Sequence, residues 1–273
     1  MQDWKDRAIL ITGAGRGIGK RLALGFAAVG APVGLLGRTR AEIDLASLEI
    51  EHAGGAALRL YADVRDYSQV RVAVDRMTAI FGGVHILIAG ASIQGTIGPF
   101  VSADPGAWSD VITVNVVGVM HAFRAVLPAM LERRSGKIIA LSGGGVRDAR
   151  PNFTAYAASK TAVARLVETL AEEVRDHNVQ VNAMAPGGTY THMTDEIIQA
   201  GLAAGEKEME DATKIRASGG TPAEKQIQLA LFLASERSNH ISGKLIHVND
   251  DWKRLEQSSL SPEVFTLRRI QKI

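Results

Sequence analysis

The chain has 273 residues, a length that suits one large α/β domain and would also allow two smaller ones. Its hydrophobic and charged fractions, 46% and 22%, are those of a globular protein, and a formal net charge of +2 disfavours nucleic acid as a partner. Cysteine is absent, which excludes disulfide bonds and thiolate chemistry, and the seven histidines lack the spacing of a metal site.

Short apolar runs alternate with helical segments along the whole chain. Strands are predicted at residues 8–12, 32–36, 57–61, 85–89, 137–141, 179–183 and 244–248. One helix is predicted from the end of a glycine loop at residue 19 to residue 29. Further helices are predicted at residues 40–53, 68–81, 108–131, 154–177 and 222–234. Continuous apolar strands that alternate with helices predict a parallel sheet covered by helices on both faces.

The apolar stretch at residues 111–130 is interrupted by Asn115, His121 and Arg124, so we expect a buried helix there rather than a membrane span. The first residues run directly into a strand and lack a signal-peptide pattern, which predicts a cytoplasmic protein without a membrane partner. Because no repeat or linker divides the chain, we expect one domain at residues 1–252, followed by a tail at 253–273.

A glycine loop, GAGRGIG, separates the first strand from the first helix. In this context glycines let the backbone approach a pyrophosphate, and the helix N-terminus presents its amides to it. A tight turn without a ligand is the alternative. The pattern is Thr12-Gly13-x-x-x-Gly17-Ile18-Gly19, which resembles the short-chain dehydrogenase/reductase family. The loop residues predicted to bind a dinucleotide are Gly13, Gly15, Arg16, Gly17, Ile18 and Gly19.

The second predicted strand ends in Leu-Leu-Gly-Arg, with Arg38 last and no carboxylate at its tip. A carboxylate at this point binds the ribose 2′-hydroxyl of NAD, whereas an arginine accommodates the 2′-phosphate of NADP. Arg38, together with Arg16, therefore indicates a preference for NADP(H), with NAD(H) as the second choice. The alternative is that Arg38 is a solvated residue at the start of a helix.

The resemblance implies further cofactor contacts at the ends of the third and fourth strands. It implies that Asp63, followed by Val64, binds the adenine amino group, although Asp66 suits the N-cap of the next helix better. The family has two asparagines where this chain has Ala89 and Gly90, and these small residues are expected to pack against the cofactor through their backbone.

Tyr156 and Lys160 stand four residues apart in a predicted helix, so both project from one face. An ammonium near a phenol favours the phenolate, and we expect Lys160 to lower the pKa of Tyr156. A tyrosine tuned in this way can give a proton to a carbonyl oxygen or take one from an alcohol. Ser142, at the end of the preceding strand, could hydrogen-bond the same oxygen. Taken alone, Tyr-x-x-x-Lys is more often an ordinary amphipathic helix.

The family resemblance also places Tyr156 and Lys160 in the cofactor site, with Lys160 on the ribose, and it assigns roles to more residues around this pair. Asn115 is implied to hold a water that links the lysine to solvent; the alternative is a buried asparagine satisfied by the protein. The family's serine usually stands 13 residues before the tyrosine; Ser142 stands 14 before it, and Gly143 occupies the usual place. A Pro-Gly-x-x-x-Thr pattern, implied to hold the nicotinamide and phosphates, places Pro186, Gly187, Thr189 and Thr191 in the cofactor site.

The segments after this motif are expected to shape the substrate site and the surface. Residues 194–220 are predicted to be partly helical and to form a lid over the substrate. The tail is expected to dock on its own domain or across a subunit interface. One hypothesis is that Arg268 or Arg269 reaches the substrate pocket and favours an anionic ligand; the alternative is a surface-packed tail with solvated arginines.

The resemblance covers about residues 6–250 and implies a single-domain Rossmann-type, doubly wound, seven-stranded parallel sheet. It implies an NADP(H)-dependent oxidoreductase that interconverts a ketone and a secondary alcohol, with Tyr156 as general acid and base. Its partners would be a small carbonyl or alcohol substrate and further copies of itself, as a dimer or tetramer. The alternatives are a cofactor-binding sensor or scaffold with little catalysis, and an epimerase or dehydratase that uses the same tyrosine and lysine.

Overall fold

The computed structural model describes residues 3–257, 260–261 and 263–267. They form a seven-stranded parallel sheet in the order β3-β2-β1-β4-β5-β6-β7. The strands are β1 Ile9–Thr12, β2 Val33–Gly37, β3 Ala57–Tyr61, β4 Ile86–Ala89, β5 Gly136–Leu141, β6 Val179–Ala185 and β7 Leu245–His247. The strand order reverses beside β1, which pairs with both β2 and β4. In open parallel sheets, ligands bind at this switch point, beyond the carboxyl ends of the strands.

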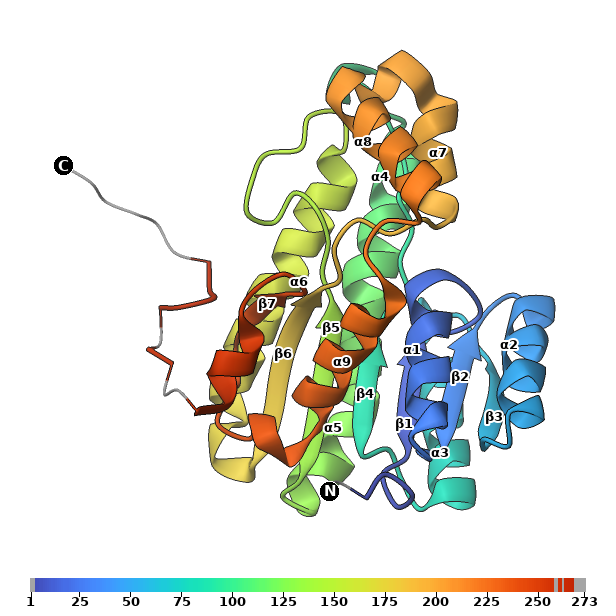
Figure 1. The fold of residues 1–273 in the computed structure, drawn as a ribbon, viewed down its shortest axis with the longest axis vertical. Coiled ribbons are helices and arrows are strands. Elements are labelled where there is room, and N and C mark those ends of the chain that lie inside the picture. The colour runs from blue at the N-terminus through green and yellow to red at the C-terminus, as the bar shows by residue number, and fades with distance from the viewer. Residues whose placement is uncertain (1–2, 258–259, 262, 268–273) are drawn as a thin grey trace.

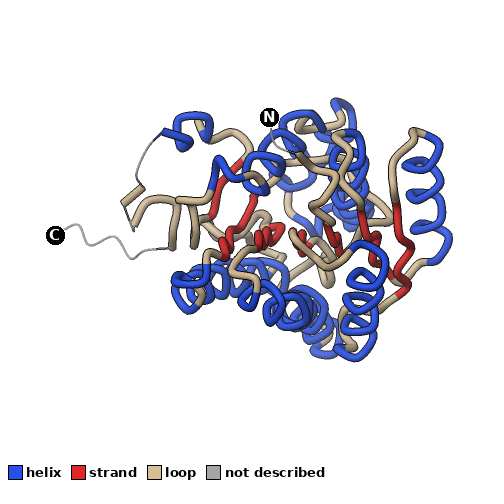
Figure 2. The backbone as a smooth tube through the Cα atoms, turned by 90° about the horizontal axis from the view of Figure 1, so that it is seen from below, coloured by secondary structure: helices blue, strands red, loops and turns tan. Residues whose placement is uncertain are grey.

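Helices cover both faces of the sheet, as predicted (Figures 1 and 2). One face carries α1 Gly17–Ala28, α2 Arg40–His52 and α9 Ala223–Ala234, and the other carries α3 Tyr67–Phe81, α5 Gly118–Glu132 and α6 Thr154–Glu173. Three more helices, α4 Pro105–Ile112, α7 His192–Ala200 and α8 Glu206–Ser218, continue the structure beyond the carboxyl ends of the strands. Each face buries its own apolar cluster, because strand residues point alternately to the two sides.

The predicted strands are each found within two residues of their expected bounds, and Asp66 caps α3 as expected, accepting hydrogen bonds from the backbone N–H groups of Ser68 and Gln69. The expected helix at 108–131 lies within one helical stretch, Pro105–Glu132. A π-helical turn, Thr113–Val117, joins α4 to α5 within this stretch, and Asn115 lies buried in the turn. The expected helix at 154–177 ends earlier, at Glu173, and a 3₁₀ turn follows it.

The helical stretch Pro105–Glu132 is long enough, and with a mean hydropathy of 1.6 apolar enough, to cross a membrane. Half of its most apolar window is buried inside the protein, where Val111, Ala122 and Val126 are part of the core. The sequence expectation of a buried helix rather than a membrane span holds for this stretch.

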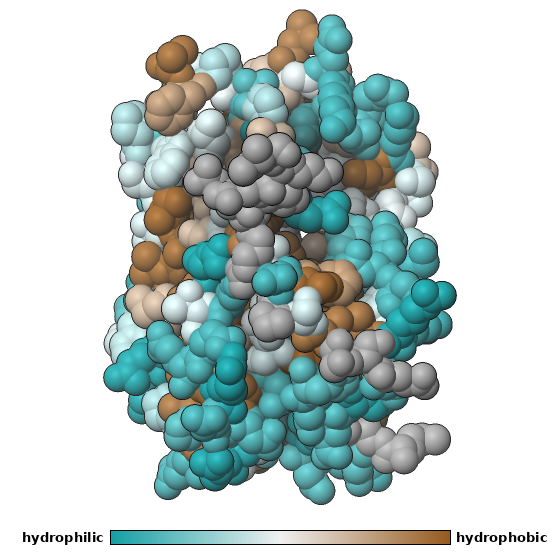
Figure 3. Space-filling view, turned by 90° about the vertical axis from the view of Figure 1, so that its left-hand side faces the viewer, coloured by the Kyte–Doolittle hydropathy of each residue, from teal (hydrophilic) through white to brown (hydrophobic). Residues whose placement is uncertain are grey.

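The described part of the tail lies against the open edge of β7. The N–H of Leu245 donates to the carbonyl of Phe265, and Lys244 Nζ donates to the carbonyls of Ser261 and Val264. Figure 3 views this side of the molecule, where hydrophobic residues show among mostly hydrophilic ones. The hypothesis about Arg268 and Arg269 concerns positions outside the described residues.

Candidate active site

A pocket of about 250 Å³ opens at the carboxyl edge of the sheet, beside the switch point between β1 and β4. It is lined by the glycine loop, by the residues that follow β2, β3 and β4, and by the start of α7. Most of the residues predicted to bind a dinucleotide border it: Gly13, Gly15, Arg16, Gly17, Ile18, Gly19, Arg38, Asp63, Val64, Gly90, Tyr156, Lys160, Pro186 and Thr191.

The glycine loop packs closely against neighbouring backbone at two residues that lack side chains. Gly13 has a φ of 72°, and a Cβ there would lie 2.8 Å from the backbone of Ala91. A Cβ on Gly19 would collide with the carbonyl oxygen of Gly13. No side chain of the described residues caps the N-terminus of α1, so its first N–H groups are available to an anion. The loop therefore fits the pyrophosphate of a nicotinamide dinucleotide.

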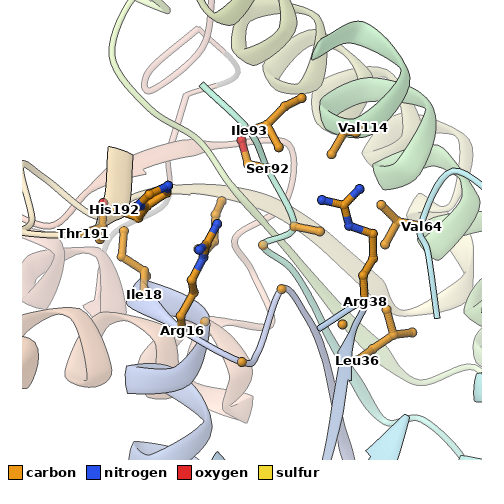
Figure 4. Close-up of a pocket in the computed structure, with 18 of the residues that line it drawn as sticks. Arg16, Ile18, Leu36, Arg38, Val64, Ser92, Ile93, Val114, Thr191 and His192 are labelled. Carbon is orange, nitrogen blue, oxygen red and sulfur yellow. The ribbon is translucent and has the colours of Figure 1, made fainter. Parts of the chain in front are cut away.

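Two arginines stand at the mouth of this pocket, and Figure 4 shows both guanidinium groups rising into it. The side chains of Arg16 and Arg38 are 60% and 58% exposed. Each has one carboxylate near it, Glu42 at 3.3 Å from Arg16 and Asp63 at 3.9 Å from Arg38. Ion pairs this exposed contribute little to stability, so both cations can turn to an incoming phosphate.

Glu42 is a lining residue that sequence reasoning missed. The second strand ends without a carboxylate, but the first turn of α2 brings Glu42 back over the glycine loop. A Cβ on Gly15 would lie 2.8 Å from the Cβ of Glu42. Asp63 is held chiefly by Arg65, whose hydrogen bond at 2.7 Å lowers the pKa of that carboxyl. Both carboxylates remain available as acceptors for the sugar or base of a nucleotide.

Three predicted cofactor residues do not line this pocket. Ala89 is buried inside β4, while Gly187 and Thr189 border a second cavity described below. The turn after β4, where the family has asparagines, is held instead by Thr12, whose hydroxyl accepts hydrogen bonds from the N–H groups of Gly90 and Ala91 at 3.1 and 3.2 Å. The central strands stay in register at this point, with Thr12 opposite Ala89.

Tyr156 and Lys160 lie on one face of α6, as predicted, and both side chains are buried at the base of the pocket. Lys160 Nζ donates a hydrogen bond to the carbonyl of Leu141 at 3.0 Å and lies 5.5 Å from the centroid of the Tyr156 ring. Because Leu141 ends β5, this bond ties the ammonium to the sheet. The lysine is thereby held beside the phenol.

The pKa of Tyr156 is raised in this structure, whereas the sequence led us to expect a lowered one. Burial raises it, because the phenolate loses its hydration, and the charge of Arg150 opposes this effect. Burial also lowers the pKa of Lys160 to about 8. Tyr156 is consequently a neutral phenol at physiological pH, ready to donate a proton.

The residue that faces the phenol is a glycine. A Cβ on Gly143 would lie 2.5 Å from the Tyr156 hydroxyl oxygen. Ser142 is 4% exposed and its Oγ makes no hydrogen bond within the described residues, although it borders the pocket. The structure therefore does not join Ser142 directly to Tyr156, and its hydroxyl remains available to a ligand.

Asn115 is fully buried and its side chain is satisfied by the protein. Its Oδ1 accepts from the N–H of Ile93 at 2.9 Å, and its Nδ2 donates to the Ile93 carbonyl and to Ser159 Oγ, both at 3.0 Å. This side chain ties the loop after β4 to α6, next to Lys160. The water relay implied by resemblance stays a prediction.

A second cavity, of about 700 Å³, adjoins the first and shares Ser142 and Tyr156 with it. Its walls come from the loop after β5, from α7 and α8, and from the end of β7. Arg150 in that loop makes a bidentate ion pair with Glu208 of α8, at 3.0 and 2.7 Å. This pair joins the loop to the expected lid, residues 194–220, beside the cavity. Sequence reasoning did not single out Arg150 or Gln94, which also borders this cavity, because each is a lone polar residue in a loop.

Comparisons with known proteins agree with this geometry. Residues 7–201 match the family model described as short chain dehydrogenase. The chain is 33% identical over 247 residues to a 3-oxoacyl-acyl-carrier-protein reductase of Thermotoga maritima, covering 90% of this chain and 97% of that protein. It is 32% identical over 247 residues to a 5-keto-D-gluconate 5-reductase of Escherichia coli, covering 88% and 93%.

Solved structures show the same likeness. An NAD⁺-bound xylitol dehydrogenase aligns with a TM-score of 0.82 at 25% identity, covering 90% of this chain and 98% of that one. A gluconate 5-dehydrogenase of Burkholderia cenocepacia, in complex with NADP and tartrate, aligns with a TM-score of 0.77 at 30% identity, covering 91% and 95%. Similar proteins thus include binders of either dinucleotide.

Proposed function

The chain belongs to the short-chain dehydrogenase/reductase family, and on that premise we propose that it reduces a small ketone to a secondary alcohol with NADPH, Tyr156 giving the proton. It is an NAD(P)-dependent oxidoreductase that acts on CH–OH groups and their ketones. The observation that carries the proposal is the place of Tyr156, on the wall that the dinucleotide pocket shares with the larger cavity.

Each residue at this wall has a role that follows from its contacts. When bound, the nicotinamide dinucleotide supplies the hydride of the reduction. Tyr156 donates its phenolic proton to the substrate oxygen, and the charge of Lys160, held at the Leu141 carbonyl, stabilises the phenolate that is left. Ser142 Oγ, buried and without a partner among the described residues, offers a hydrogen bond to the same oxygen.

The state of the phenol fits the reduction that we propose. Because burial raises the pKa of Tyr156, the group carries its proton at neutral pH, as a proton donor must. Two of the similar proteins, the 3-oxoacyl and 5-keto-gluconate enzymes, are likewise named as reductases.

The preference for NADPH rests on Arg16 and Arg38. Two exposed guanidinium groups at one pocket mouth suit a dianionic 2′-phosphate, which arginine binds with paired hydrogen bonds. Glu42 opposes this preference, because its carboxylate would repel a phosphate. It already faces Arg16, however, whose positive charge offsets this repulsion.

We expect Arg16→Ala and Arg38→Ala each to raise the KM for NADPH about tenfold or more, since a hydrogen bond to a charged group contributes roughly 1.5–3 kcal/mol. The KM for NADH should change little, because NADH has no 2′-phosphate. Steady-state kinetics with both dinucleotides measures this. Lys20→Ala is the matched control, since Lys20 is a cation of α1 that pairs with Glu49 outside the pocket. An equal rise in the KM for NADH and for NADPH would contradict the assignment.

Oxidation of NADPH in the presence of a panel of small ketones tests the proposed function. We expect turnover that depends on the ketone and a secondary alcohol as product. Tight NADPH binding without turnover of any ketone would favour the alternative of a cofactor-binding sensor. That result would overturn the catalytic proposal while leaving the fold and the dinucleotide site intact.

A further inference from the structure

Gln94 is a buried polar side chain for which neither the fold nor the proposed proton transfer accounts. It follows β4, borders the larger cavity, and is 2% exposed. Its Nε2 makes no hydrogen bond within the described residues. A buried amide group left without a partner costs about 1–3 kcal/mol, so its presence calls for a ligand.

The backbone on both sides of Gln94 is fixed. On one side, Asn115 binds both the N–H and the carbonyl of Ile93. On the other, Gly95 has a φ of 74° and leaves no space for a side chain, because a Cβ there would collide with Val111 of α4. The backbone that carries Gln94 is therefore fixed before any ligand arrives, which limits the positions that its amide can take.

Gln94 also lies close to the place where the substrate must react. Its neighbour Ile93 borders the dinucleotide pocket, whereas Gln94 borders the larger cavity, so the two residues span the wall between them. Ser142 and Tyr156 border both spaces. The position that faces the Tyr156 hydroxyl, Gly143, contributes no polar side chain.

We propose that the Gln94 amide hydrogen-bonds a hydroxyl or second carbonyl group that the substrate carries next to its reacting keto group. An amide both donates and accepts, so it can satisfy either group. The substrate class is then an oxygenated ketone, such as a hydroxyketone or keto sugar, rather than a simple aliphatic ketone. This inference rests on the proposed function.

Two ketones that differ by one hydroxyl group test the proposal. We would measure kcat/KM with NADPH for 3-hydroxy-2-butanone and for 2-butanone, in the wild type and in Gln94→Met, which keeps the length of the side chain and removes the amide. Gln94→Leu is the second variant if the methionine variant does not fold. Gln228→Met, an exposed glutamine of α9 bonded to Glu224, controls for the substitution itself.

We expect the wild type to prefer 3-hydroxy-2-butanone by tenfold or more, and Gln94→Met to lose that preference while its activity on 2-butanone stays within about threefold. A site built around a buried amide discriminates in this way, because the ketone without the hydroxyl leaves the amide unpaired. Equal losses on both ketones in Gln94→Met would mean a merely structural role and would overturn the proposal.

The test of the Gln94 role can fail while the proposed reductase function stands. Reduction of both ketones without a preference that depends on Gln94 refutes the role of Gln94 and leaves the reductase intact. Failure of the wild type to reduce either ketone or any other of the panel refutes the reductase and this inference together. Calorimetric titration of 3-hydroxy-2-butanone into the NADP⁺-loaded protein adds a readout without turnover, in which Gln94→Met should bind about tenfold more weakly.

Discussion

Tyr156→Phe should lower kcat for ketone reduction by about 10²–10⁴-fold, the range in which a positioned proton donor acts. The variant removes a single oxygen atom and keeps the buried ring, which packs with Phe153 and Ile197, so the fold should be preserved. The KM for NADPH should change little, because the dinucleotide site is built mainly from the glycine loop and the two arginines. Steady-state kinetics separates the two constants.

The matched control for this variant is Tyr67→Phe. Tyr67 begins α3, on the same face of the sheet as α6, but its ring lies against His121 of α5 and borders neither cavity. It should retain the activity of the wild type. If Tyr156→Phe also retained comparable activity, Tyr156 would not be the proton donor.

Lys160→Met should lower kcat by about a hundredfold or more, because it removes the charge that stabilises the phenolate. It should also raise the KM for NADPH, since Lys160 borders the dinucleotide pocket as well. If Lys160 acted only through packing, Lys160→Met would lower kcat and raise the KM for NADPH only slightly. Such a result would contradict an electrostatic role for Lys160.

Lys137 offers a matched control for this substitution. It is another buried lysine whose pKa is lowered by burial, to about 7, but it lies in β5 toward the amino end of the strand. Its Nζ donates to Ser238 and Asn239, away from both cavities. Lys137→Met should therefore leave kcat and KM unchanged, although it can alter stability.

Lys160, the lysine of the active site, sets the pH dependence of reduction. Its pKa is lowered to about 8, so its charge is present below that pH and is lost as pH rises through it. Tyr156 keeps its proton over this range, because its own pKa is raised. We expect kcat/KM for ketone reduction to be level below about pH 8 and to fall above it. A profile that rises with pH across this range would contradict the assignment.

Much of the fold could be predicted from the sequence, because apolar strands and helical periodicity each leave a local pattern. The glycine loop and the spacing of Tyr156 and Lys160 are local in the same sense, and the structure brings them to one pocket. The π-helical turn at Thr113–Val117 had no such signal, since the apolar pattern continues through it.

The parts that could not be predicted depend on contacts between distant segments. Glu42 and Gln94 become lining residues only through the path of α2 and of the loop after β4. The direction of the Tyr156 pKa shift depends on how fully the phenol is buried, which residue spacing does not reveal. Whether Ser142 or Gly143 faces the phenol is likewise set by the course of the loop after β5.

Transfer of deuterium from NADPH labelled at C4 of the nicotinamide is the most direct test of the central claim, that this chain reduces a ketone through Tyr156. Each of the two C4-labelled stereoisomers would be supplied with 3-hydroxy-2-butanone, and the alcohol analysed by NMR. We predict that one stereoisomer places deuterium on the carbinol carbon in step with NADPH consumption, and that Tyr156→Phe abolishes nearly all of this transfer. An unlabelled alcohol from both stereoisomers, or undiminished transfer in Tyr156→Phe, would contradict the claim.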